Sequence, residues 1–383
     1  MWRVAGALVV VMIMSVGIAA TPEPPAYQPD WPAIARHMVE TSLALAPGER
    51  VLISHDPSRD PAFIAALRAE ILRAGGIVSG EIAWPSASEA KFLEGLTSDE
   101  KHRRAELENA TYRELFAHSD VYLWLHVSNA EELVPRQFEH LIAESKVRAI
   151  HSHWFEPEDP VERNAVRRMY ERAITRDPET LEVRLAPLEA ALRGARVHIT
   201  SPLGTDLTFR IPADAWFHHN TGEATRRKIA TARSTRDREE ELPAGVLRTT
   251  DVLGANGTLA VSLLGGTRDD LITVKFRDGL IVKVTTKGAG GAEFSKWYDS
   301  ISGDRDRISE LVIGTNPDLV PIQPSGFMPY YGYGAGVIRI AIGENWESGG
   351  KLRTSNGSEA WLFVTDGTLT AGKARLIEAG QLR

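Results

Sequence analysis

Two histidines separated by one residue are the first candidate metal ligands of this chain. His151 and His153 point to the same side if their segment is extended, and Glu156 and Glu158 follow closely. Imidazole and carboxylate are both ligands that zinc accepts. A histidine pair at the end of a strand is also common in loops without a metal, so the sequence leaves both interpretations open.

A second histidine pair and an aromatic segment are candidates for lining a binding pocket. His218 and His219 lie near Glu223, but adjacent residues of a strand point to opposite faces, which argues against one shared site. Tyr331 and Tyr333 alternate with glycines. That pattern indicates either an aromatic lip over a site or a tight loop packed on the domain.

Histidine and cysteine are unevenly distributed, which limits the chemistry. The chain has no cysteine, and its 11 histidines all precede position 220. Thiol nucleophiles, disulfides, thiolate zinc sites and iron–sulfur clusters are therefore excluded. A non-haem iron site of two histidines and one carboxylate, as in ring-cleaving dioxygenases, would need both histidines from the N-terminal half.

Charge and motifs exclude further classes of function. The 44 Lys and Arg against 51 Asp and Glu give a net charge of −7, which disfavours nucleic-acid binding. The sequence contains neither a phosphate-binding loop ending in Gly-Lys-Ser/Thr nor a Gly-x-Ser-x-Gly elbow. Nucleotide hydrolysis and serine-esterase chemistry therefore have no support.

The N-terminus is typical of an exported protein. Arg3 precedes an apolar run, and small residues around Ala19 and Ala20 form a cleavage site, so residues 1–20 are predicted to be a signal peptide. The run is too short for a stable membrane anchor, which needs about 20 apolar residues. Residues 21–30 are predicted to be a Pro-rich linker, and the mature protein is expected to be periplasmic or secreted.

The pattern of apolar residues divides the remainder into two parts. Residues 31–185 alternate helices, expected at 34–45, 61–73 and 161–175, with strands at 50–54, 120–127 and 147–151. This order predicts an α/β domain with a parallel sheet. Residues 186–383 are β-rich, with helices expected at 292–300 and 304–309 and a charged loop at 222–241, which predicts an α+β domain that holds the cleft.

Several collinear segments over about residues 45–380 resemble the metal-dependent aminopeptidases of the aminopeptidase T type, the thermophilic metalloprotease family. They lie at 51–53 with Asp56 and Asp60-Pro61, and at 200–209, 242–245, 255–259, 276–279, 310–317, 340–345 and 349–350. The resemblance implies the two-domain fold, a homodimer and a pair of divalent ions (zinc, cobalt or manganese) held in the C-terminal domain. The implied activity is release of N-terminal amino acids from peptides.

Most ligand positions that the resemblance implies have changed. Glu310 keeps its position and is the remaining metal-ligand candidate, whereas Arg339 stands where a histidine is expected. We hypothesise that Arg339 forms a salt-bridge cluster with Glu310 and Glu359 in place of the ions. The positions of the former metal site are Val246, Glu310, Arg339, Glu359 and Trp361.

These changes favour an exported, non-catalytic homologue that binds a peptide or another small molecule. The alternative is an active aminopeptidase with a carboxylate-only metal site on Glu310, Glu359 and water. Candidate pocket residues are Trp346, Tyr331, Tyr333 and His218.

Overall fold

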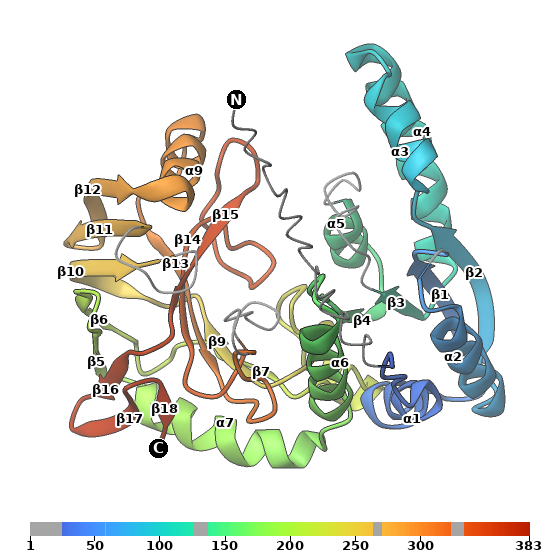
Figure 1. The fold of residues 1–383 in the computed structure, drawn as a ribbon, viewed down its shortest axis with the longest axis horizontal. Helices are drawn as coiled ribbons and strands as arrows, with labels where there is room; N and C mark the ends of the chain where they lie inside the picture. Colours follow the sequence, from blue (N-terminus) through green and yellow to red (C-terminus); the bar gives the residue numbers. More distant parts are fainter. Residues whose placement is uncertain (1–24, 58, 126–136, 263–269, 323–332) are drawn as a thin grey trace, which may run out of the picture.

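The computed structural model describes residues 25–57, 59–125, 137–262, 270–322 and 333–383 (Figure 1). The predicted signal peptide and Tyr331 lie outside these residues. No helix in the described part of the chain is long and apolar enough to cross a bilayer.

The N-terminal half contains the predicted parallel sheet. Its strands are β1 (Arg50–His55), β2 (Ile77–Ala83), β3 (Val121–Leu125) and β4 (Arg148–Ser152), all paired in parallel. The residues of β3 and β4 are all buried, as expected for strands covered on both faces. The helices expected here are α1 (Trp31–Arg36), continued by the π-helical turn η1 (His37–Ser42), α2 (Pro61–Arg73) and α6 (Pro160–Ile174).

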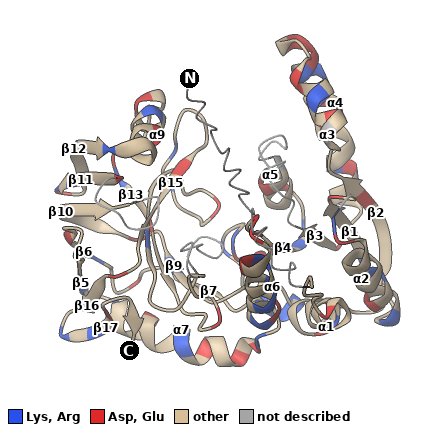
Figure 2. Ribbon diagram, in the orientation of Figure 1, with Lys and Arg blue, Asp and Glu red and all other residues tan. Residues whose placement is uncertain are grey.

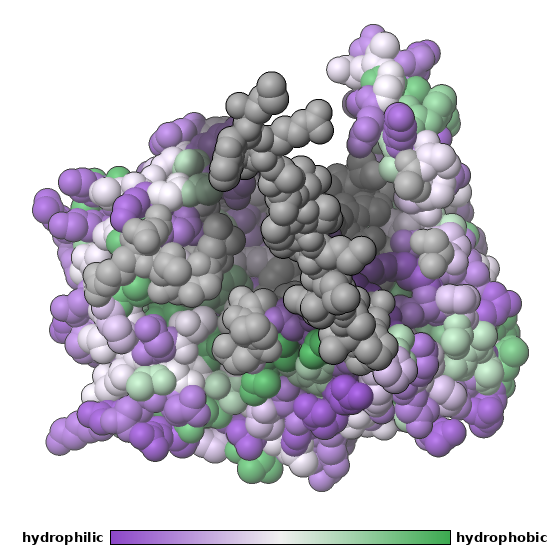
Figure 3. All heavy atoms as spheres, in the orientation of Figure 1, coloured by the Kyte–Doolittle hydropathy of each residue, from purple (hydrophilic) through white to green (hydrophobic). Residues whose placement is uncertain are grey.

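Two helices of this half form an arm that stands clear of the rest of the molecule (Figures 1 and 3). They are α3 (Ala87–Glu94) and α4 (Ser98–Ala117). Another helix, α5 (Gln137–Glu144), precedes β4 in the chain. Ser86 with Glu89 and Thr97 with Glu100 form capping boxes at the starts of α3 and α4. Both basic and acidic residues occur along α4 and α7 (Pro178–Leu192) (Figure 2).

The fifth strand of the parallel sheet comes from the C-terminal half. Strand β8 (Glu239–Leu242) pairs in parallel with β4, and the short helix α8 (Arg226–Ile229) precedes it. The prediction of a loop over 222–241 is therefore wrong at both of these elements. The three consecutive glutamates of β8 suggest solvent exposure, but they are buried and compensated by ion pairs within the fold.

Two antiparallel sheets form the rest of the C-terminal half. The larger one, which we call sheet B, has the order β12-β11-β10-β6-β5-β16-β17-β18. The smaller one, sheet C, has the order β15-β14-β13-β9-β7. Sheet B consists of β5 (Arg196–Thr200), β6 (Asp206–Arg210), β10 (Leu253–Val261), β11 (Leu271–Arg277), β12 (Leu280–Lys287), β16 (Thr368–Ala371), β17 (Ala374–Glu378) and β18 (Gln381–Leu382). Sheet C consists of β7 (His218–Asn220), β9 (Val246–Thr249), β13 (Ile308–Gly314), β14 (Ile338–Gly343) and β15 (Glu359–Val364).

Helices join and flank these sheets. The helix expected at 292–300 is α9 (Gly288–Ser300), whereas the one expected at 304–309 is wrong, because a turn there leads into β13. Pairing of β13 with both β9 and β14 outweighs the local pattern. The boundary expected between residues 185 and 186 lies inside α7, which runs along one edge of the molecule from α6 to β5 (Figure 1).

The buried apolar core is continuous across that boundary. One core cluster combines residues of the parallel sheet, such as Ile53 and Ile150, with Leu242, Val246 and Val312 from the C-terminal half. The mixed α/β and β-rich architecture agrees with the predicted fold class. The charged residues of the candidate site lie at the junction between the parallel sheet and sheet C.

Candidate functional site

The register of sheet C brings the predicted site positions to one face. Arg248 of β9 and Arg339 of β14 both lie opposite Val312 of β13. Residues opposite one another, and every second residue along each strand, project from the same face of a sheet. By this rule the face carries Val246, Glu310, Arg339, Glu359 and Trp361.

Arg339 and Glu310 form a buried ion pair, and both side chains are at most 4% exposed. The guanidinium Nη2 donates to Glu310 Oε2 at 3.0 Å, and the Ser348 hydroxyl donates to the other carboxylate oxygen. Arg339 also lies 4.8 Å from the ring centroid of Trp361, a cation–π arrangement. Arg339 thus places a fixed positive charge beside Glu310. At the position of Arg339 the resemblance implies a histidine ligand.

Burial and charge have opposite effects on Glu310. Burial acts to raise its pKa, but the charges of Arg248 and Arg339 and the Ser348 hydrogen bond outweigh burial and hold the pKa of Glu310 below its usual value. Glu310 is therefore ionised at neutral pH.

Glu359 lies beside this pair without an ion pair of its own among the described residues, so the hypothesised salt-bridge cluster forms between Arg339 and Glu310 and does not extend to Glu359. Burial, followed by repulsion from Glu310, raises the pKa of Glu359 to about 8, although Arg339 acts in the opposite direction. Glu359 and Glu310 line a small pocket, of about 10 Å³, together with Glu344, Asn345, Trp346, Glu347 and Gly357. The pocket wall is thus strongly acidic, with one aromatic face.

Trp346, a predicted pocket residue, lies in this pocket wall. Its indole stacks on His140 of α5, with ring centroids 4.4 Å apart and an interplanar angle of 2°. Because His140 belongs to the N-terminal half, the stack connects the two halves beside the pocket.

The other predicted positions have different surroundings. Tyr333 is buried, and its hydroxyl donates to Glu241. His218 is buried against Asp237, and burial lowers its pKa to about 4 despite that hydrogen bond. His219 points away to Glu182, as expected for an adjacent strand residue. Val246 belongs to the apolar core.

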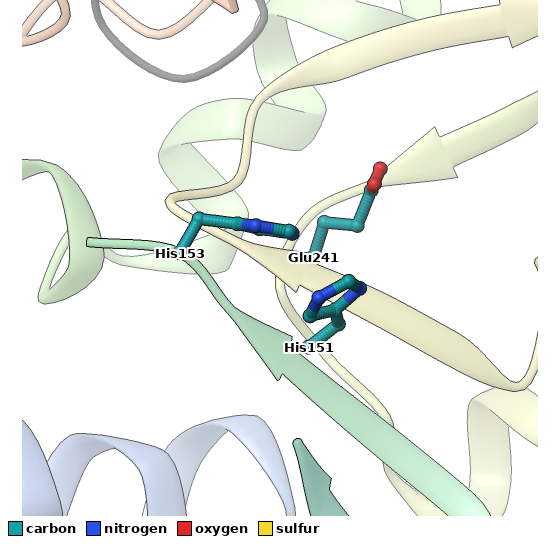
Figure 4. Close-up of side chains that lie close together, drawn as sticks. All are labelled: His151, His153 and Glu241. Atoms are coloured by element: carbon teal, nitrogen blue, oxygen red, sulfur yellow. The ribbon is translucent and has the colours of Figure 1, made fainter. Parts of the chain in front are cut away.

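A second cluster unites His151 and His153 with Glu241 (Figure 4). His151 of β4 lies directly opposite Glu241 of β8, and the His153 backbone N–H donates to the Leu242 carbonyl at 2.7 Å. One potential ligand atom from each side chain lies within 4.8 Å of the others. All three residues are buried, so the cluster is a candidate metal centre.

The carboxylate of this cluster differs from the one that the sequence suggests. Glu156 instead accepts hydrogen bonds from Trp154 and Arg167, and the carbonyl of Glu158 accepts one from Arg163. Glu241 could not be found from sequence spacing, because only the pairing of β4 with β8 brings it to the histidines. The i, i+2 spacing of His151 and His153 was the available signal.

Arginines surround Glu241 and connect the two clusters. Arg248 Nη2 donates to Glu241 at 2.8 Å while its Nε lies 3.8 Å from Glu310. Arg236 lies 3.4 Å from Glu241 and 3.3 Å from Glu239. Burial acts to raise the pKa of Glu241, but the charges of Arg236 and Arg248 hold it well below the usual range.

Comparisons with known proteins support a relationship of fold. No protein-family model matches the sequence, and a search of curated proteins found no match. The structure is similar to 2,5-dihydroxypyridine dioxygenase from Pseudomonas putida KT2440, with a TM-score of 0.61, 15% identity and 92% of this chain and 96% of that chain covered. It is also similar to AmpT from Thermus thermophilus, with a TM-score of 0.62, 16% identity and coverage of 92% and 98%. The chain therefore has the fold predicted from its resemblance to aminopeptidase T.

Proposed function

We propose that this protein is an exported, non-catalytic binding protein with an aminopeptidase-like fold, and that its pocket takes the protonated amino terminus of a peptide or a similar small amine. The observation that carries the proposal is the composition of the pocket wall. Four carboxylates and the indole of Trp346 line a pocket of about 10 Å³, the space of one water-sized group such as an ammonium. Carboxylates and aromatic faces are the groups that bind ammonium ions in proteins.

Glu359 supplies the place for the ammonium group. Within the described residues it has no ion-pair partner, and burial followed by the neighbouring Glu310 raises its pKa to about 8. An incoming cation would stabilise the ionised form and so release a proton on binding. Glu310 is already compensated by Arg339 and Ser348, which leaves Glu359 as the principal contact.

The loss of catalysis is inferred from Arg339. In the relatives that the sequence resembles, divalent ions polarise the peptide carbonyl and activate water. Here the Arg339 guanidinium stands at the position of a ligand that the resemblance implies, and it hydrogen-bonds to Glu310, the one retained ligand candidate.

Calorimetric titration with trialanine tests the proposal. We expect saturable binding to the wild type, about 10-fold weaker binding to Glu359→Gln, and none for N-acetyl-trialanine, which lacks the ammonium group. Glu144→Gln, which changes an exposed carboxylate on α5, is the matched control and should bind like the wild type. Equal affinity for both peptides would overturn the proposal.

The alternative of an active aminopeptidase is tested with the same protein. Cleavage of aminoacyl-anilides in the presence of Zn²⁺, Co²⁺ or Mn²⁺, lost in Glu310→Gln, would replace the non-catalytic proposal with a carboxylate-only metal site on Glu310 and Glu359. No cleavage, together with trialanine binding, is the result expected from the pocket.

A further inference from the structure

We infer that His151, His153 and Glu241 bind one divalent transition-metal ion, at a site distinct from the acidic pocket. Two imidazoles and one carboxylate form a donor set that suits Zn²⁺, Co²⁺ and Fe²⁺. The three side chains come from β4, the residue after it, and β8 (Figure 4).

The backbone positions these donors before any metal arrives. His151 and Glu241 are directly opposite in the parallel pairing of β4 and β8, so their side chains project from the same face. His153 is two residues further along and is tied to β8 by its N–H bond to Leu242. Their ligand atoms lie within 4.8 Å, and tetrahedral coordination at bond lengths of about 2.1 Å needs separations of about 3.4 Å.

Neighbouring groups orient the first imidazole. Glu239 Oε1 lies 3.1 Å from His151 Nδ1, and the indole of Trp124 stacks on the ring at 3.8 Å with an angle of 5°. When Nδ1 donates to Glu239, Nε2 carries the lone pair that a metal ion requires. A carboxylate behind a ligating histidine is a usual feature of zinc sites.

The charge of the surrounding network permits a cation. Ion pairs link three guanidinium groups with four carboxylates around the cluster: Arg236, Arg248, Arg339, Glu239, Glu241, Glu310 and Glu347. These linked groups carry one more negative than positive charge. A cation bound by the histidines would offset this excess negative charge.

The test is metal binding by purified protein first dialysed against a chelator. We expect Co²⁺ to produce a visible absorption spectrum that saturates at one equivalent and that Zn²⁺ removes by competition. His153→Ala should weaken binding at least 100-fold, and Glu239→Gln about 10-fold. His198→Gln changes an exposed histidine on sheet B and should bind like the wild type.

X-ray absorption of the Zn²⁺-loaded wild type gives a readout independent of the variants. Two imidazole ligands at about 2.0–2.1 Å would support the site even if His153→Ala fails to fold. Absence of saturable binding, a spectrum without imidazole ligands, or unchanged binding by folded His153→Ala would overturn it. Trialanine binding is measured on the metal-free protein, so failure of this site leaves the proposed function separately testable.

Discussion

Arg339 supplies positive charge at Glu310, at a position where the resemblance to aminopeptidase T implies a histidine ligand. The pair is almost completely buried, and each partner makes the burial of the other tolerable. Such pairs contribute little compared with apolar residues of the same volume, but loss of one partner leaves an uncompensated charge. Loss of Arg339 should therefore destabilise the fold. The neighbouring Glu359, which has no ion-pair partner among the described residues, should make the stability depend on pH.

Replacement of Arg339 by methionine should destabilise the protein by about 3–5 kcal/mol, because Glu310 would stay buried with only Ser348 and the more distant Arg248. The measurement is urea unfolding followed by circular dichroism. The double variant Arg339→Met, Glu310→Gln should recover a large part of that loss, since it removes both charges. A loss below about 1 kcal/mol for the single variant would show that the pair is not coupled as described.

Glu359 should make stability fall as pH rises. Its folded-state pKa is about 8, whereas an unfolded chain has a glutamate pKa of about 4.3. The folded state therefore binds the extra proton between these values, and this contribution is present below pH 4.3 and lost as pH rises through 8. Glu359→Gln should flatten the decline of Tm between pH 5 and pH 8 by a few degrees. Identical pH profiles for the variant and the wild type would contradict the raised pKa.

At the scale of elements, the sequence predicts β1, β3 and β4 but misses β8, the strand that assembles the candidate metal centre. Apolar runs such as those of β1, β3 and β4 indicate buried parallel strands directly. In β8 three of four residues are glutamates, and local pattern cannot reveal that Arg236, Lys228 and His151 compensate them. His151 and His153 could be named from their spacing, whereas Glu241 required the long-range pairing.

The segment before β8 is fixed by one buried arginine. Arg148 pairs with Glu49 at 2.6 Å, and its Nη1 donates to the carbonyls of Leu43 and Ala224 at 2.7 Å each. Arg148→Met should cost about 3–5 kcal/mol, because Glu49 would stay buried with Arg226 alone.

Arg50→Met provides the matched control for this prediction. Arg50 pairs with Asp120 at the same end of the sheet, but both side chains are about 40% exposed, so solvent screens the pair and the expected loss is much smaller than for Arg148→Met. Chemical denaturation of both variants gives the comparison. Similar losses for Arg148 and Arg50 would mean that burial does not determine the strength of these pairs.

At the scale of the whole molecule, we expect residues 1–20 to be removed during export. The apolar run and the small residues before Thr21 are the basis of this prediction. Expression in a Gram-negative host, followed by mass spectrometry of the periplasmic fraction, should give a chain that begins at Ala20 or Thr21. Retention of Met1 in a cytoplasmic product would contradict it.

The continuity of the core predicts that the two halves do not fold separately. Cutting the chain after Leu192 removes β8 and core residues such as Leu242, Val246 and Val312. The fragment 21–192 would then expose β4 as a sheet edge, and Arg148 would lose the Ala224 carbonyl. We expect this fragment to lack a cooperative urea transition, whereas the intact protein unfolds cooperatively. Co-expression with fragment 193–383 should restore the transition, because it returns β8 and its core residues. A sharp transition of fragment 21–192 alone would show that the N-terminal sheet is an independent folding unit and that β8 only docks onto it.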